Sequence, residues 1–372
     1  MIMLSKFRNV FNKRVYDFQK YRSYRLTNND LSKVESTPLT ASEKQQIDNI
    51  YSSLYSDIWN KKDDGRYIGH QLYKALNGFN PLFVPETFMY PLILAAINNR
   101  CLIQSFQHKA LYDFYYHEID RPLTLGKCIN GVIYNSSNNV LSKQELLREL
   151  SKYEKFIVKP SCDSERGMNV RIYTSDSINK DFYNNELKRY NGNFIIQTLV
   201  NQSVQTSKFN NGSLNTFRIN TLSLNGEVSL STIGFRCGKG NSIVDNVGAG
   251  GLMVGVNSNG EFKKYAYDAQ FRKYTMNNEV QFEKTVIPQV SKMCAIALNA
   301  HKQYLPFLGI VAWDFCLDVN EKPIMIEVNL DWLGTEMEQI CSQEGIFGTR
   351  TKEFIDYAVK AHPVYLIDYN IR

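Results

Sequence analysis

Residues 310–329, IVAWDFCLDVNEKPIMIEVN, decide the fold, because they describe two strands joined by a short polar turn. The first strand, 311–319, is apolar except for Asp314 and Asp318, and the second, 324–328, leads into Glu327-Val-Asn329. We expect the turn at Asn320-Glu321 to pair the two strands antiparallel, which brings Asp314 beside Glu327 and Asn329. Glu327 and Asn329 are two residues apart, so their side chains point to the same face of the sheet.

Asp314 needs a chemical explanation, because an unpaired charge buried in an apolar strand is costly. Mg²⁺ prefers oxygen ligands and commonly takes one or two carboxylates together with substrate phosphates. Asp314, Glu327 and Asn329 are therefore predicted to hold Mg²⁺. The same pattern also fits a buried ion pair between Asp314 and either Arg218 or Arg236.

A second motif lies upstream, where Lys159 ends a short apolar strand and the polar loop PSCDSERGMNV (160–170) follows. The loop has a single glycine, Gly167, and leads into another predicted strand at 169–173. A Walker P-loop would instead place G-x-x-x-x-G-K-[ST] at the start of a helix. The strand–loop–strand pattern favours a flap over phosphates, with Lys159 as a point charge beneath it. A surface hairpin with an edge lysine fits the same residues.

A third block, residues 213–251, carries arginines and glycines. Arg218 lies in a predicted strand, 216–224, and Arg236 follows another, 228–235, before the run DNVGAGG (245–251). Arginines at sheet positions suit the bidentate holding of a phosphate or an acyl phosphate. The glycines let the backbone approach a ligand closely. Each of these motifs is ordinary when taken alone.

The organisation of the 372-residue chain predicts more than one lobe. Residues 26–100 read as mostly helical, with an amphipathic segment at 41–59 and a turn-rich join at 77–85. Strands and helices alternate afterwards, with a capping box at Ser142 and Glu145, a strand at 194–199 and a helix near 286–302. We expect a helical region at 1–90 and two lobes at 91–200 and 201–372.

The N-terminal residues 4–25 predict a basic amphipathic helix, because apolar residues recur at helical spacing among seven lysines and arginines. Such a helix can lie on an anionic membrane surface, or it can pack on the main body with a solvated basic side. The chain has no apolar run near the ~20 residues that span a bilayer and no signal-peptide core. We expect a cytoplasmic protein, with contact at the inner face of the membrane left open.

Composition excludes several other classes. The net charge of +6 suits a polyanionic substrate or nucleotide, but there is no basic-aromatic platform for nucleic acid. The 7 cysteines are scattered without a C-x-x-C motif, and the 5 histidines are isolated. Neither a disulfide framework nor a zinc site is predicted.

Taken in this order, the motifs resemble the ATP-grasp superfamily, in its sugar-transfer-associated and capsular-polysaccharide branch. The resemblance spans roughly residues 80–350 and is carried by IVKP (157–160), FIIQT (194–198), LNTFR (214–218), DN (245–246) with GG (250–251), and Trp313-Asp314 with Glu327-Val-Asn329. It implies an α+β fold in which two α+β lobes grip ATP between them, after a helical N-terminal region. One departure is the single glycine in the flap, where relatives carry two or three.

The resemblance also implies a role for each matching residue. Lys109 and Lys159 would contact the phosphates of ATP, and Ser161 and Gly167 belong to the flap. Adenine would be read by the hinge, Gln197, Thr198, Leu199 and Val200. Mg²⁺ would be held by Asp314, Glu327 and Asn329, while Arg218 and Arg236 stabilise the transferred phosphoryl group. The acceptor side would be formed by Asn215, Asn246, Gly250 and Gly251.

The activity implied is an ADP-forming carboxylate–amine ligase that makes an amide through an acyl phosphate. The resemblance points to an acidic sugar or glycan that receives an amino acid or amine during surface polysaccharide biosynthesis. Three alternatives stay open at this stage: a ligase for peptides or small amides, a kinase that phosphorylates a hydroxyl, and a nucleotide-binding scaffold without catalysis.

Overall fold

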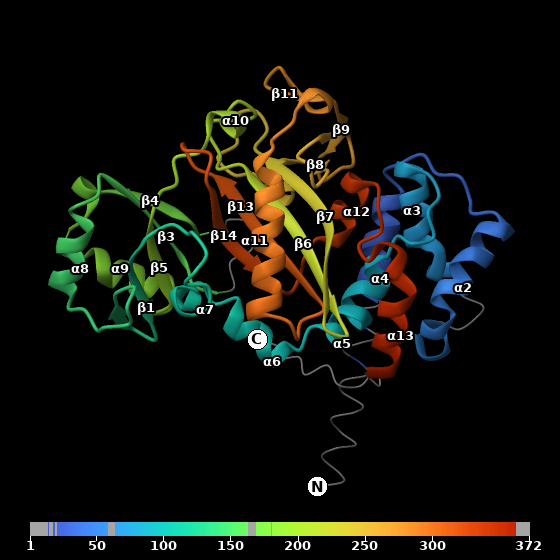
Figure 1. Cartoon of the computed structure of the whole chain (residues 1–372), viewed down its shortest axis with the longest axis horizontal. Helices are drawn as coiled ribbons and strands as arrows, with labels where there is room; N and C mark the ends of the chain where they lie inside the picture. The colour runs from blue at the N-terminus through green and yellow to red at the C-terminus, as the bar shows by residue number, and fades with distance from the viewer. Residues whose placement is uncertain are drawn as a thin grey trace, which may run out of the picture.

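The computed structural model describes residues 14, 18, 21–58, 64–162, 169–179 and 181–361. Three parts lie side by side: a five-stranded sheet with two helices, a central seven-stranded sheet, and a group of helices on the far side of the central sheet (Figure 1). Most of the predicted N-terminal amphipathic helix, and the flap residues 163–168 with Gly167, lie outside the described residues. Among the residues described, no helix is long and apolar enough to cross a membrane.

The N-terminal region is helical, as predicted. Residues 21–31 are helical, and α2 (Ala41–Ile58) begins with a capping box in which Thr40 and Glu43 bond each other's backbone amides. The turn-rich join separates the end of α3 from the start of α4. The remaining elements of this region are η1 (Asp64–Tyr67), α3 (Ile68–Asn77), α4 (Glu86–Phe88), the π-helical turn η2 (Met89–Leu94), α5 (Ala95–Ile97) and α6 (Arg100–Phe106).

This helical region packs on the central sheet and shares a core with it. Ile47 and Tyr51 of α2 contact the same cluster as Leu222, Ile310 and Phe354, the last on α13 (Thr351–Ala361). Because one buried cluster joins residues from both ends of the chain, the helices form a layer against the sheet.

The first lobe is built on a five-stranded antiparallel sheet, ordered β2-β1-β5-β3-β4. Helices α8 (Lys143–Leu150) and α9 (Phe182–Arg189) lie in the same lobe, and α8 begins with the predicted Ser142–Glu145 capping box. The strands are β1 (Thr124–Ile129), β2 (Val132–Tyr134), β3 (Lys155–Pro160), β4 (Arg171–Thr174) and β5 (Phe194–Thr198).

Alternation along β3 and β5 separates the two faces of this sheet. Phe156, Val158 and Ile196 point into the buried cluster formed with α8 and α9. Lys159 and Gln197 occupy the alternate positions, so their side chains point to the opposite face. The strand period therefore places Lys159 and Gln197 on the same side of the lobe.

The second lobe is built on a seven-stranded sheet, ordered β10-β9-β8-β7-β6-β13-β14. One face packs against α11 (Gln289–Tyr304) through residues such as Phe217, Phe235 and Trp313. The strands are β6 (Thr216–Leu224), β7 (Glu227–Cys237), β8 (Leu252–Val256), β9 (Phe262–Tyr267), β10 (Lys273–Tyr274), β13 (Ile310–Leu317) and β14 (Pro323–Asn329).

Short elements connect the larger ones in all parts of the fold. They are η3 (Lys109–Leu111), α7 (Tyr112–Tyr115), η4 (Ser175–Ser177), α10 (Val204–Ser207), η5 (Val247–Ala249), β11 (Met276–Asn277), β12 (Val280–Gln281), η6 (Phe282–Lys284) and η7 (Gly348–Arg350).

Helix α12 (Thr335–Ser342) covers the opposite face of β7 and β8 and packs closely there. Two glycines on these neighbouring strands, Gly234 and Gly255, pair with each other. A Cβ at Gly255 would collide with the carbonyl oxygen of Cys341, and a Cβ at Gly234 would lie 3.1 Å from the Glu338 carboxyl. The absence of side chains at these two positions lets α12 approach the sheet and carry Glu338 to it.

The predicted strand pair at 310–329 is confirmed. Strands β13 and β14 pair antiparallel, with Asp314 opposite Glu327 and a bulge after Asp314. The turn between them forms because Asp318 accepts hydrogen bonds from the backbone amides of Asn320 and Lys322. On its other side Asp314 pairs with Arg218 of β6. Arg218, Asp314 and Glu327 therefore occupy one row across three adjacent strands.

Candidate active site

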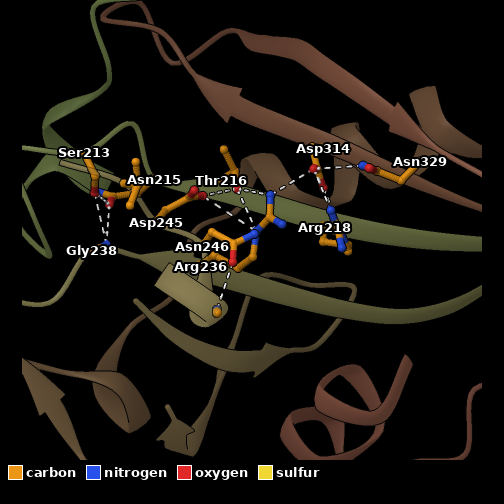
Figure 2. Close-up of polar contacts among 12 residues, drawn as sticks. Ser213, Asn215, Thr216, Arg218, Arg236, Gly238, Asp245, Asn246, Asp314 and Asn329 are labelled. Atoms are coloured by element: carbon orange, nitrogen blue, oxygen red, sulfur yellow. Dashed lines mark hydrogen bonds and ion pairs between the residues drawn. The ribbon is translucent and has the colours of Figure 1, made fainter. Parts of the chain in front are cut away.

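Asp314 lies at the centre of a buried charge network on the face of the seven-stranded sheet opposite α11 (Figure 2). Arg218 binds it bidentately, with Nε donating to Oδ1 and Nη2 to Oδ2, both at 2.8 Å. Arg236 Nη2 lies 2.9 Å from Oδ2, and Asn329 Nδ2 donates to the same oxygen at 3.1 Å. Both the ion pair weighed from the sequence and the neighbouring Asn329 are thus present.

The two arginines fix the charge of Asp314. Burial alone would raise the pKa of this carboxyl, which is only 3% exposed, but the charges of Arg218 and then Arg236 outweigh burial and hold its pKa at about 2. Asp314 is therefore ionised at every physiological pH, and it orients two guanidiniums at once.

Arg236 links this network to the Asp245 loop. Its Nε and Nη2 donate to the Thr216 hydroxyl at 3.1 and 2.7 Å, and its Nε lies 3.7 Å from Asp245 Oδ2. The Thr216 hydroxyl in turn donates to Asp245, which Figure 2 shows beside it. Burial raises the pKa of Asp245, and the nearby Arg236 opposes that rise. Asp245 was not among the predicted site residues.

Glu338 of α12 also reaches the arginines, although no sequence motif indicated it. Its side chain is 2% exposed, and its Oε2 has no hydrogen-bond partner within the described ranges. Burial raises its pKa to about 8 and the charge of Asp314 adds to the rise, while Arg218, Arg236 and a hydrogen bond from Asn220 lower it. This carboxyl therefore titrates near neutral pH behind the two guanidiniums.

The two lysines predicted to bind phosphates, Lys109 and Lys159, lie near Glu327 of β14. Lys109 Nζ lies 2.6 Å from Glu327 Oε1, and the Lys109 backbone amide donates to the carbonyl of Ser161 at 2.8 Å. Lys159 is 9% exposed, and burial, reinforced by the charge of Lys109 and opposed by Glu327, lowers its pKa to about 8. Lys159 of the first lobe, Lys109 of the segment before it and the acids of the second lobe thus lie in one place.

The hinge and flap residues carry buried polar atoms that the described part of the chain does not satisfy. Ser161 Oγ and Gln197 Oε1 have no hydrogen-bond partner there, and the two residues are 0% and 4% exposed. Thr198 is used internally, since its amide and hydroxyl pair with Leu123. Leu199 and Val200 directly follow β5. Buried polar atoms without a partner are rare in folded proteins, so these two atoms need an explanation such as a ligand.

The predicted acceptor residues divide into two groups. Asn215 is fully buried, and its amide bonds Gln202, Thr206, Ser213 and other neighbours, so its polar atoms are committed to holding a loop. Asn246 accepts from the Gly248 amide and caps the short turn η5 beside Arg236.

The glycines that follow Asn246 serve the loop geometry. Gly250 has φ of 99°, a conformation that favours glycine, and a Cβ at Gly251 would collide with the Asp245 carbonyl. These two positions hold Asp245 against Arg236.

The residues present also fit a hard cation. Asn329 turns its Nδ2 toward Asp314, which leaves its Oδ1 as an oxygen ligand next to Glu327, whose side chain is 28% exposed. Asp314 Oδ2 already accepts three donors and Oδ1 only one, so Asp314 offers one further position. Within the described ranges no group of three or more His, Cys, Asp or Glu side chains could hold a metal by itself. Such a centre needs substrate phosphates to complete it, which is typical of Mg²⁺.

Comparison with known proteins follows this geometry. A search of curated protein sequences gives no match. Solved structures to which the chain is similar include an L-amino acid ligase from Bacillus licheniformis (14% identity, 69% of this chain and 48% of that chain, TM-score 0.39). A D-alanyl-alanine synthetase A from Vibrio cholerae gives 14% identity, 69% and 65% coverage and a TM-score of 0.39.

A third match is the biotin carboxylase domain of a 2-oxoglutarate carboxylase from Hydrogenobacter thermophilus, at 12% identity, 71% and 47% coverage and a TM-score of 0.44. The chain spans between about half and two thirds of the length of these three proteins.

A family model covers most of the chain. The model described as sugar-transfer associated ATP-grasp matches residues 93–354, a range that contains Lys109, Lys159, Arg218, Asp314 and Glu327. The range begins in the last helices of the N-terminal region and ends inside α13. With an α+β fold of two antiparallel sheets and these motifs in order, the chain belongs to the sugar-transfer associated ATP-grasp family.

Proposed function

We propose that the chain is an ATP-dependent, ADP-forming ligase that joins a carboxylate to an amine. The observation that carries the proposal is the convergence of four cationic side chains near Asp314 and Glu327: Lys109 of η3, Lys159 of β3, Arg218 of β6 and Arg236 of β7. Such a set suits a reaction in which every participant is anionic: the phosphates of ATP, the substrate carboxylate and the acyl phosphate formed from them.

The first step activates the carboxylate. One carboxylate oxygen attacks the γ-phosphorus of ATP, the bond from that phosphorus to the β–γ bridging oxygen breaks, and ADP leaves with the electron pair. Lys109 and Lys159 hold the phosphates from the first lobe, while Arg218 and Arg236 face the transferred phosphoryl group from the second. Mg²⁺ would be held by Glu327, Asn329 and the remaining position on Asp314, and it would supply further positive charge at the phosphate oxygens. Catalysis of this kind rests on positioning and electrostatics.

The second step forms the amide. The amine nitrogen attacks the carbonyl carbon of the acyl phosphate, phosphate leaves, and the nitrogen gives its proton to solvent or to the departing phosphate. The reaction requires no covalent enzyme nucleophile. The buried state of Cys128, Cys237 and Cys316 agrees with a site that uses none.

We further propose an acidic sugar or glycan as the carboxylate, with an amino acid or amine as the acceptor. Support comes from the sugar-transfer association of the family and from the cationic character of the site. Action in the cytoplasm, with contact at the inner face of the membrane through the basic N-terminal segment, remains part of this proposal.

The test is ADP release by the purified chain with Mg²⁺, ATP and a panel of uronic-acid oligosaccharides and amines, compared with pairs of free amino acids. We expect ADP and an amide product with the acidic sugars. Glu327→Gln is the decisive variant, because it removes the charge of a predicted metal ligand without changing its size. Normal turnover in Glu327→Gln would sink the assignment, and a phosphorylated sugar would show a kinase instead.

A further inference from the structure

Strand β14 ends the seven-stranded sheet, so its outer edge has no strand beside it. Its backbone amides are nevertheless satisfied by residues of another segment. Met325 N–H donates to the carbonyl of Asp120 at 2.8 Å, and Val328 N–H donates to the hydroxyl of Tyr112 at 3.1 Å. A segment that precedes the first lobe in sequence therefore covers the edge of the strand that carries the metal ligands.

Gln107 binds the backbone amides of the two residues that follow the end of β14. Its Oε1 accepts the backbone amides of Leu330 at 2.6 Å and Asp331 at 3.1 Å. A carbonyl oxygen has two lone pairs, so one glutamine side chain can fix two successive peptide groups. Asn329 lies between Val328, held by Tyr112, and Leu330, held by Gln107.

The same short segment, residues 107–112, reaches the first lobe. We refer to these residues as the strut. Within it, the Lys109 amide donates to the Ser161 carbonyl at the base of the flap, and Lys109 Nζ contacts Glu327 at 2.6 Å. The Tyr112 hydroxyl also donates to the carbonyl of Gln107 at 3.3 Å, which ties the two ends of the strut together. The strut thus touches the nucleotide lobe and the metal strand at once.

We propose that Gln107 is a positioning residue for the metal-binding loop, and that it fixes Asn329 through the amides of Leu330 and Asp331. The metal part of this proposal rests on the proposed function, whereas the grip on the loop does not. With the backbone held on both sides, the Asn329 side chain keeps its Nδ2 on Asp314 at 3.1 Å and its Oδ1 beside Glu327. Loss of the grip would leave that oxygen unaligned, because both peptide groups could then turn toward water.

The chain offers matched variants. Gln107→Met keeps the length of the side chain and removes the acceptor, while Gln107→Glu keeps an acceptor for both amides. Gln339 of α12 is the control, because its Oε1 also accepts two amides, those of Val84 at 2.7 Å and Ile346 at 3.1 Å, in a structural role away from Asn329. A loss common to glutamines that accept two backbone amides would appear in Gln339→Met as well.

The first measurement is hydrogen exchange of the full chain without ligands. In Gln107→Met we expect the amides of Leu330 and Asp331 to exchange about tenfold faster or more, since local opening sets their protection. In Gln107→Glu and Gln339→Met we expect these two amides to keep their wild-type rates. Unchanged exchange at Leu330 and Asp331 in Gln107→Met would overturn the proposal.

The second measurement is Mn²⁺ binding followed by electron paramagnetic resonance, with ADP present. We expect Gln107→Met to weaken Mn²⁺ binding about tenfold or more, and Gln107→Glu to restore it, since partners outside the ligand shell typically account for 10–100-fold in affinity. Wild-type Mn²⁺ affinity in Gln107→Met, together with faster loop exchange, would show that the grip does not position the metal ligands. A wild-type chain that binds no Mn²⁺ would overturn the proposed function and the metal part of this proposal, and exchange would still decide the grip.

Discussion

The two lobes offer opposite kinds of polar surface at the site. On the seven-stranded sheet, the Asp314 carboxylate is already bound by Arg218, Arg236 and Asn329. On the five-stranded sheet, buried polar atoms lack partners among the described residues, as Ser161 Oγ and Gln197 Oε1 do. One lobe thus carries a carboxylate that three side chains already bind, and the other carries buried polar atoms without partners among the described residues.

This difference indicates that the two lobes have different roles at the site. A carboxylate that two arginines hold before substrate arrives needs no rearrangement when charge develops, which is the condition for electrostatic stabilisation of a transition state. Unsatisfied buried groups cost stability in the free chain and gain partners when a ligand binds. Changes in the second lobe should therefore affect folding as well as activity, whereas changes in the first should affect mainly nucleotide affinity.

The largest expected effect is that of Asp314→Asn, which leaves two buried guanidiniums without their shared counterion. Removing one partner of a buried ion pair costs about 3–5 kcal/mol. We expect the free energy of unfolding, measured in urea, to fall by that order, and Mg²⁺-dependent ATP turnover to be lost.

Glu327→Gln is the comparison for Asp314→Asn. Its side chain is 28% exposed and pairs with Lys109 at the edge of the network. We expect the free energy of unfolding to fall by less than about 1 kcal/mol, the range of partly exposed pairs. Equal losses of stability in the two variants would show that Asp314 is not the hub of a preformed network.

The next effect is expected at Glu338, and unlike the first two it depends on pH. Burial raises the pKa of this carboxyl from 4.5 to about 8, so between these values the folded chain keeps a proton that the unfolded chain releases. Its contribution to stability is therefore fully present below pH 4.5 and is lost as pH rises toward about 8. Glu338→Gln mimics the protonated form and should escape this loss.

The measurement for Glu338 is urea unfolding of wild type and Glu338→Gln at pH 5.5 and pH 8. We expect the variant to gain stability relative to wild type between these two values, by up to about 1.4 kcal/mol per unit of pKa shift. The groups that face Glu338 and keep their charge across this range are Arg218, Arg236 and Asp314. The same difference at both pH values would mean that Glu338 is ionised throughout.

The smallest of the three effects concerns nucleotide affinity in the first lobe. Burial, with the charge of Lys109, lowers the pKa of Lys159 to about 8, so its charge is lost as pH rises above that value. We expect the KM for ATP to rise about tenfold between pH 7 and pH 9, since one unit above the pKa leaves about a tenth of the lysines charged.

Lys159→Met should show a high KM for ATP that varies less with pH. The same pKa shift predicts that the free wild-type chain gains stability as pH rises from about 8 toward 10.5, because only the unfolded chain binds the extra proton there. A wild-type KM that stays constant between pH 7 and pH 9 would contradict a role for the Lys159 charge in holding ATP.

Local patterns explain which parts of the fold the sequence predicts. The pair β13–β14, the capping box at Ser142 and the helix at 41–58 rest on neighbours in the chain, and all three are confirmed. Strands β8 to β10 were not predicted, because a glycine-rich lead and the two lysines at 263–264 mask their alternation. Segment ends differ by one to three residues, as at β4, which begins at Arg171 instead of Asn169.

The prediction of site residues from the sequence has the same limit: it finds local patterns and misses contacts made by tertiary packing. Asp314, Glu327 and Lys159 are predictable, because a charged residue in an apolar strand is conspicuous. Glu338 and Gln107 are not, because each is an ordinary polar residue of a helical segment. Their positions arise from tertiary packing: α12 is seated on Gly234 and Gly255, and the strut lies along the edge of β14.

The covered edge of β14 has a consequence for the behaviour of the protein in concentrated solution. An exposed strand edge is a template on which a second chain can add its own strand, and natural sheets block such edges to avoid aggregation. Asp120, Tyr112 and Gln107 occupy the amides through which another molecule would pair. The hydrogen bonds from this segment therefore block part of this edge against pairing with another copy of the chain.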